Sequence, residues 1–134
     1  MGIIHFCLYR LKEVCEFLLK LGDVYKRHMS PRLALCCDIP LEIIPPTTHF
    51  PHPFGIAIRE KTILGNNCII KQNVTIGMRR NHAEDGAVIG NNVEICANAL
   101  ILGPVNIADN VKIGAGAIVL KDVGEGQTIV GVWK

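Results

Sequence analysis

Branched apolar side chains recur every six residues along the C-terminal two thirds of the chain. One series ends at Ile76 and a second begins at Ile89, and a small or medium-sized residue follows most members four positions later. An α-helix has a period of 3.6 and a plain strand a period of 2, so neither explains a period of six. Short strands joined by corners of fixed length explain such a period. The two series are Ile58, Leu64, Ile70 and Ile76, then Ile89, Ile95, Ile101, Ile107, Ile113 and Val119.

Residues that tolerate turn geometry lie between these apolar positions, as in Gly65-Asn66-Asn67 and Gly90-Asn91-Asn92. Glycine adopts a positive φ without penalty, and Asn and Asp adopt it more readily than other residues. Each hexad therefore predicts a short strand and a corner. Three hexads close a triangular coil of about 18 residues, and stacked coils bury one apolar column. We expect a mainly β fold, a parallel β-helix, over residues 55–134.

The repeat breaks once. His82 stands where the next apolar residue after Ile76 would fall, and the register resumes at Ile89, so seven residues have been inserted. Segment 78–86 is polar and charged and ends in Gly, which predicts a loop extruded from one corner. Long loops on a regular scaffold often carry binding or catalytic residues.

The N-terminal part of the chain follows other patterns. Apolar residues from Ile4 to Tyr25 alternate spacings of three and four, which predicts one amphipathic helix within residues 1–30. We expect it to pack on the β-helix or on a neighbouring subunit; association with a membrane surface is the alternative. Residues 31–54 contain six prolines and are predicted to form an irregular segment leading into the coil, because proline cannot sit in a central ladder.

Composition excludes several function classes. A net charge of +2 over 134 residues is too small to indicate a nucleic-acid-binding protein. The six cysteines show no C-x-x-C spacing, and two of them fall on small apolar positions of the repeat, which favours reduced core thiols and a cytoplasmic location. No uncharged run approaches the roughly 18 residues that a membrane helix needs, so no transmembrane segment is expected.

The run His52-Pro53-Phe54-Gly55-Ile56-Ala57-Ile58 leads directly into the first regular coil. Together with the hexads, it resembles the hexapeptide-repeat acyltransferases, and among them the serine acetyltransferases and related sugar O-acetyltransferases. The resemblance covers about residues 38–134 and implies a left-handed parallel β-helix. It also implies acetyl transfer from acetyl-CoA to a hydroxyl of serine or of a sugar or glycan.

On the same resemblance, His52 is the general base. Imidazole suits this role because a group with a pKa near 6.5 takes the hydroxyl proton at neutral pH and returns it to the departing thiolate. A histidine that merely caps the end of the solenoid is the alternative.

Two further candidates for the catalytic site follow from the resemblance. Asp38 stands fourteen residues before His52, in an Asp-Ile context similar to that of the Asp that orients the family's histidine. A surface carboxylate is the equal alternative. The family's second histidine lies in an Arg-His-Pro run three residues before the repeat resumes, but that position is Gly86 here. His82, four residues earlier, is the remaining candidate, with an exposed loop histidine as the alternative reading.

The resemblance also indicates where the acyl donor binds. Ala97 and Ala115 stand one coil apart and so share a corner; similar small residues in the family line the groove for the pantetheine arm between two subunits. Val119-Leu120-Lys121-Asp122 matches a run whose Lys contacts the coenzyme phosphates, and Lys134 lies in a variant of the family's closing motif. A homotrimer with interfacial active sites is therefore implied. Alanines that merely fit the corner are the alternative.

Two other functions remain possible on the same fold. A γ-type carbonic anhydrase binds zinc through three histidines across a trimer interface; His49, His52 and His82 supply the number but not the His-x₄-His spacing, so no metal is expected. A structural solenoid that binds no coenzyme is the second alternative.

Overall fold

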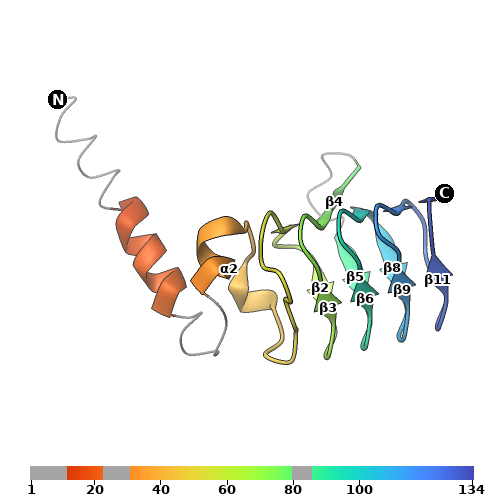
Figure 1. The fold of residues 1–134 in the computed structure, drawn as a ribbon, viewed down its shortest axis with the longest axis horizontal. Coiled ribbons are helices and arrows are strands. Elements are labelled where there is room, and N and C mark those ends of the chain that lie inside the picture. The colour runs from red at the N-terminus through yellow and green to blue at the C-terminus, as the bar shows by residue number, and fades with distance from the viewer. Residues whose placement is uncertain (1–11, 23–30, 80–85) are drawn as a thin grey trace.

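The protein was analysed as a computed structural model, which describes residues 12–22, 31–79 and 86–134 (Figure 1). From residue 57 onward, short strands of successive coils align into parallel sheets, and the predicted mainly β fold is confirmed. The strands are β1 (Ala57–Ile58), β2 (Ile63–Leu64), β3 (Ile69–Ile70), β4 (Thr75–Met78), β5 (Ala87–Ile89), β6 (Glu94–Ile95), β7 (Leu100–Gly103), β8 (Val105–Ile107), β9 (Lys112–Ile113), β10 (Ile118–Val119), β11 (Thr128–Ile129) and β12 (Val132–Trp133).

Each of the first three coils contributes one strand to each of three sheets, and the fourth contributes β10 to sheet 1 and β11 to sheet 3. Sheet 1 has the order β1-β4-β7-β10-β12, sheet 2 the order β2-β5-β8, and sheet 3 the order β3-β6-β9-β11. Ala57 pairs with Thr75, and Leu100 pairs with Ile118, so in both pairs the partner lies 18 residues along the chain. One coil is therefore three hexads long, as the repeat predicts.

The inserted residues lengthen one coil. Thr75 pairs with Leu100, a separation of 25 residues in place of 18. The extra residues lie between the end of β4 and the start of β5, at the corner between sheets 1 and 2. Met78, predicted as the first loop residue, instead pairs with Gly103 in sheet 1. The insertion therefore begins after Met78, because this residue still has a backbone partner in the next coil.

The hexad residues form the interior of the coil. All ten are buried, and none exposes more than 7% of its surface. The smaller residues four positions later are buried as well, among them Cys68, Ala99 and Ala117. A large and a small side chain from each hexad thus share the narrow interior, as close packing requires. The six-residue period is thus a packing requirement.

The corners use Asn and Gly differently from the prediction. Asn67, Asn92 and Asn110 adopt the left-handed conformation, with φ of 57°, 56° and 60°, whereas Gly65 does not. Gly65 is required for a different reason: a Cβ there would lie 2.5 Å from the backbone of Gly90 in the next coil. The Asn supplies the turn, and the Gly allows the coils to approach closely.

Residues 12–22 are helical, which agrees with the predicted N-terminal helix over the part of it that is described. Its apolar side chains are largely exposed: Val14, Phe17, Leu18 and Leu19 each leave at least 40% of their surface in contact with solvent. Leu21 packs against the core, and the Lys20 Nζ donates to the Cys37 carbonyl oxygen at 3.5 Å. The helix thus meets the coil through its C-terminal end (Figure 1).

Residues 31–54 are more regular than predicted. They contain helix α2 (Pro31–Cys36) and the 3₁₀ turn η1 (Leu41–Ile43). Pro31 does not break α2, because proline at the first helical position removes an N–H that would have had no partner within the helix. Leu33, Ile39 and Ile44 of this segment are buried and close the N-terminal end of the coil. A solenoid needs such a cap, since its last coil otherwise exposes the apolar column.

Candidate functional site

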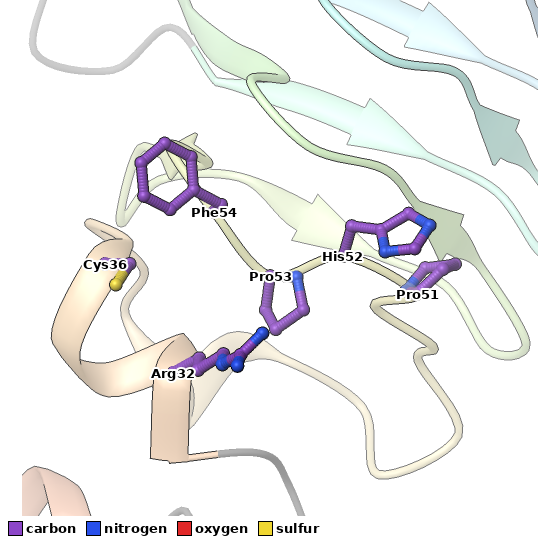
Figure 2. A pocket seen from close by; sticks show the side chains of 6 residues that line it. All are labelled: Arg32, Cys36, Pro51, His52, Pro53 and Phe54. Carbon is purple, nitrogen blue, oxygen red and sulfur yellow. The ribbon is translucent and has the colours of Figure 1, made fainter.

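A pocket of about 340 Å³ lies at the N-terminal end of the coil (Figure 2). Two lining residues, Arg32 and Cys36, come from α2, and the others from the segment that enters β1. The complete lining is Arg32, Cys36, Pro51, His52, Pro53 and Phe54. The predicted general base therefore belongs to a pocket whose other wall is a helix that was not predicted.

The backbone around His52 is held in a tight conformation. The Phe54 amide donates to the His52 carbonyl oxygen at 2.8 Å, a bond between residues two apart that defines a γ-turn. Proline stands on both sides of His52, and a residue before proline is restricted to extended backbone. The two prolines thus limit the backbone conformations of His52, and with them the positions that its imidazole can take.

The pocket segment is fastened both to α2 and to the next coil. The Gly55 amide donates to the carbonyl oxygen of Cys36 at 2.9 Å, and the Asn73 amide donates to the carbonyl oxygen of Phe54 at 2.9 Å. Gly55 has a φ of 62°, and a Cβ on it would lie 2.3 Å from the Asn73 side-chain oxygen. The glycine of the His-x-x-Gly run is therefore required by the fold at this position.

The His52 side chain is exposed, and no hydrogen bond joins it to another described residue. Figure 2 shows the imidazole beside Pro51, on the side of the chain away from Phe54. An exposed nitrogen is available to a substrate hydroxyl. The arrangement can thus serve a general base whose partner arrives with the substrate.

Asp38 lies on sheet 1. Its amide donates to Ile56 and its carbonyl oxygen accepts from Ile58, so it extends the sheet by one bridge to Ala57. Its side chain is exposed, and within the described residues it makes no hydrogen bond or ion pair with His52. The predicted orienting role of Asp38 stays a prediction.

The predicted second histidine, His82, lies outside the described residues. Gly86, which occupies the position of the family's second histidine, is described. A Cβ at Gly86 would lie 2.1 Å from the carbonyl oxygen of Lys61, so this backbone has no room for a side chain. A histidine at position 86 would therefore need a different path of the backbone at this corner.

Ala97 and Ala115 lie at the corner between sheets 3 and 1. The Gly116 amide donates to the Ala97 carbonyl oxygen at 2.9 Å, which brings the two corners into contact. Ala97 is half-buried and Ala115 is exposed. Short side chains here leave the backbone accessible, as a groove for an extended thiol arm requires.

The two predicted phosphate ligands lie elsewhere. Lys121 is at the corner between sheets 1 and 2, at the opposite end of the sheet 1 strands from Ala115, and its Nζ lies 4.5 Å from the centre of the Trp133 ring. The Trp133 Nε1 in turn donates to the carbonyl oxygen of Asp122 at 3.1 Å. Lys134 is exposed and follows β12. One copy of the chain does not bring Lys121 to the Ala97 corner.

A charged cluster on sheet 3 was not predicted. Glu94 accepts from the Nζ of Lys71 at 2.6 Å and from that of Lys112 at 3.0 Å. The hydrogen bond from Lys71, followed by that from Lys112, lowers the pKa of Glu94 to about 2. These residues come from consecutive coils, so the ladder of sheet 3 aligns them. The cluster ties three coils together on the outer face.

Arg32 and Cys36 are the pocket residues that sequence reasoning missed. Both lie in the segment predicted to be irregular, where no period marks an inward or outward face. A helix start at Pro31 was the available signal, because proline is favoured at the first helical position. Within residues 12–22, 31–79 and 86–134, no three His, Cys, Asp or Glu side chains are grouped to hold a metal ion. The same residues form no helix long and apolar enough to cross a membrane.

Comparison with known proteins supports the predicted resemblance. Residues 86–121 match the family described as bacterial transferase hexapeptide (six repeats). A serine acetyltransferase of Synechococcus elongatus is 40% identical over 82 residues, which cover 60% of this chain and 34% of the relative. A serine acetyltransferase of Helicobacter pylori is 38% identical over 81 residues, covering 60% of this chain and 47% of the relative.

Solved structures give the same picture. The serine acetyltransferase of Neisseria gonorrhoeae in complex with serine superimposes with a TM-score of 0.61 at 40% identity, covering 63% of this chain and 35% of that one. Serine acetyltransferase isoform 3 of Entamoeba histolytica in complex with cysteine gives a TM-score of 0.57 at 32% identity, with coverages of 63% and 33%.

The chain spans about a third to a half of the length of the curated relatives it matches. The matched part contains the repeats and not the remainder of those enzymes. Over this part, the sequence and the structure point to the same group of proteins. The chain carries the hexapeptide transferase repeat and, over about three fifths of its length, is similar to the serine acetyltransferases.

Proposed function

We propose that this protein is an acetyl-CoA-dependent O-acetyltransferase that acts on L-serine from a left-handed β-helix, with His52 as the general base. The observation that carries the proposal is the position of His52 in a pocket at the start of the coil, within the run that resembles the serine acetyltransferases. Similarity to serine acetyltransferases in sequence and fold favours serine over a sugar as acceptor.

In the proposed reaction, His52 removes the proton of the serine hydroxyl as its oxygen attacks the thioester carbonyl carbon. The C–S bond of the resulting tetrahedral intermediate then breaks, and the departing thiolate takes the proton from the imidazolium. A positioned base of this kind contributes about 10²- to 10⁴-fold to the rate. Asp38 is proposed to orient the imidazole, and His82 to complete the site.

Acetyl-CoA is the co-substrate in this proposal and supplies the activated acetyl group. Ala97 and Ala115 fit its arm, because they are short side chains on the same corner of two successive coils, which the hydrogen bond from Gly116 to Ala97 joins. Lys121 and Lys134 are proposed to meet its phosphates. Lys121 lies at the other end of the sheet 1 strands from the Ala97 corner, as the two ends of an extended coenzyme would need. A homotrimer with interfacial sites is part of the proposal.

Acetyl-CoA consumption tests the proposal. The full chain is assayed with L-serine and with a panel of sugars, and we expect turnover with L-serine. His52→Ala should lower kcat at least about 100-fold, whereas the matched variant His49→Ala, a nearby exposed histidine outside the pocket, should keep wild-type activity. Full activity in His52→Ala would remove the proposed base.

The alternatives give different results in the same preparation. A structural solenoid shows no increase in melting temperature with CoA, because a ligand that does not bind cannot stabilise the fold. A carbonic anhydrase-like enzyme contains stoichiometric zinc. A sugar acetyltransferase consumes acetyl-CoA with sugars and not with L-serine.

A further inference from the structure

Gln72 occupies the same corner position as Ala97 and Ala115, one coil before Ala97. In each of these three coils the residue that follows has a positive φ, so the corner turns in the same way each time. The following residues are Asn73, Asn98 and Gly116, with φ of 56°, 61° and 68°. The corner between sheets 3 and 1 thus carries one longer polar side chain in line with the two alanines.

Backbone hydrogen bonds connect this corner to the pocket that holds His52. The Asn73 amide donates to the carbonyl oxygen of Phe54 at 2.9 Å, and the Asn98 amide donates to that of Gln72 at 3.1 Å. Phe54 therefore stands at the corner position of the preceding coil, and it lines the pocket. The order along the corner is Phe54, Gln72, Ala97 and Ala115. Gln72 thus lies between the pocket and the groove proposed for the thiol arm.

The side-chain oxygen of Gln72 is buried and has no hydrogen-bond partner among the described residues. A buried acceptor without a partner destabilises the fold, because it has lost its hydrogen bonds with water. A leucine of similar size would avoid this cost, so the fold alone does not account for a glutamine here. The unpaired oxygen indicates a ligand that brings the missing donor.

We propose that the Gln72 carboxamide binds the amide of acetyl-CoA that lies nearest the sulfur, and so holds the thioester level with the pocket of His52. This inference rests on the proposed function, because it adds a residue to the acyl-donor site of that reaction. The terminal bond of a glutamine side chain rotates easily, so the carboxamide can turn its oxygen toward an N–H of the arm.

The spacing along the corner fits this assignment. Two carbon atoms separate the sulfur of CoA from the nearest amide nitrogen, a length similar to the rise of about 4.8 Å from one coil to the next. With that amide at Gln72, the thioester lies one coil earlier, at Phe54 and the pocket. The rest of the arm continues past Ala97 and Ala115, where the side chains are short.

Calorimetric titration of the full chain tests the assignment without any turnover. CoA and adenosine 3′,5′-bisphosphate, which keeps the nucleotide but lacks the arm, are titrated into wild type, Gln72→Leu and Gln127→Leu. Gln127 is exposed and immediately precedes β11, so its variant controls for the loss of a carboxamide. We expect Gln72→Leu to weaken CoA binding by about tenfold, as loss of a hydrogen bond does, and to leave bisphosphate binding unchanged.

The free protein gives a readout that a purely structural role would not. Gln72→Leu removes a buried, unpaired oxygen, so without ligand its melting temperature should equal or exceed that of the wild type. Gln72→Glu keeps the size and an acceptor oxygen, and its CoA affinity should lie between those of wild type and Gln72→Leu. Four results would overturn the inference: wild-type CoA affinity in Gln72→Leu, an equal loss for both ligands, a marked loss of stability in Gln72→Leu, or no CoA binding by the wild type.

Failure of this inference is distinguishable from failure of the proposed function. If wild type and Gln72→Leu acetylate L-serine with equal kcat/KM for acetyl-CoA, the function holds and the role of Gln72 is wrong. If CoA binds in a Gln72-dependent way but L-serine is never acetylated, the role of Gln72 holds and the function is wrong.

Discussion

The Gly116 amide donates a 2.9 Å hydrogen bond to the carbonyl oxygen of Ala97. This bond joins two coils at the corner between sheets 3 and 1, where the side chains are short. A larger side chain on this corner would project into the groove proposed for the thiol arm of acetyl-CoA, with little effect on the interior.

Substitution of Ala115 by Leu tests that groove. Because Ala115 is exposed, Ala115→Leu should fold normally but raise the KM for acetyl-CoA by about tenfold or more, which corresponds to one lost contact of about 1.4 kcal/mol. Steady-state kinetics with acetyl-CoA as the varied substrate measure it. Ala108→Leu makes the same change at the corner between sheets 2 and 3 and should leave the KM unaltered. Equal KM values in all three proteins would place the donor elsewhere.

Gly86 and Gly77 flank the insertion and should respond differently to a methyl group. A Cβ at Gly86 meets the Lys61 carbonyl oxygen at 2.1 Å, whereas the nearest atom to a Cβ at Gly77 is at 3.7 Å. Gly86→Ala should therefore lower the free energy of unfolding by about 1–3 kcal/mol, as overpacking does. Gly77→Ala should change it by less than about 0.5 kcal/mol. Urea denaturation compares the two, and equal stabilities would show that the coils can separate at this corner.

The pairing of Glu94 with two lysines predicts a pH dependence of stability. Its pKa in the fold is lowered to about 2, mainly by the hydrogen bond from Lys71. A depressed carboxyl pKa contributes stability that is fully present above the unfolded value near 4.3 and is lost as pH falls toward 2. Because the cluster is partly exposed, the contribution should be about 1 kcal/mol or less.

Thermal unfolding of Glu94→Gln between pH 2 and 7 checks this contribution. The variant should be less stable than wild type at pH 7, and the difference should shrink as pH falls from about 4.3 to 2. The exposed Glu125→Gln serves as the control for a lost carboxylate. A difference that stays constant across this range would mean that Glu94 acts through packing and not through its charge.

Cys36 and Cys37 are neighbours in the chain but should react differently with a maleimide. Cys36 is exposed and lines the pocket, whereas burial raises the pKa of the Cys37 thiol and reduces the thiolate that reacts. Peptide mapping should find Cys36 labelled well before Cys37 or the buried Cys68. Labelling should also abolish L-serine binding, and Cys36→Ser should bind L-serine and resist the inhibition. A labelled protein that binds L-serine normally would place the acceptor outside this pocket.

The repeat could be predicted from the sequence because every coil has to meet the same packing requirement. Ile70, Ile95 and Ile113 each have to enter the same column, so the period, the coil length and the seven-residue insertion follow from spacing alone. The run around His52 could be recognised for a similar local reason: its prolines restrict the backbone, and Gly55 allows the positive φ that the turn needs, whatever surrounds them.

The N-terminal cap of the coil, within residues 31–54, could not be predicted in this way. Arg32 and Cys36 lie on a six-residue helix that is too short to show a period and too short to be stable alone. The N-terminal helix illustrates the converse: its amphipathic pattern predicted a buried face, yet Phe17 and Leu18 are exposed in the single chain.

The sequence by itself therefore determined the coil, its parallel sheets and the place of His52, because local spacing and backbone restriction act within a few residues. Only the tertiary structure decided which groups share a pocket. Arg32 and His52 line one pocket, Lys121 lies away from Ala97, and Gly86 has no room for a side chain. Each of these relationships involves residues far apart in the chain. Such relationships depend on how the cap and the successive coils are oriented relative to one another. No period in the sequence encodes that orientation.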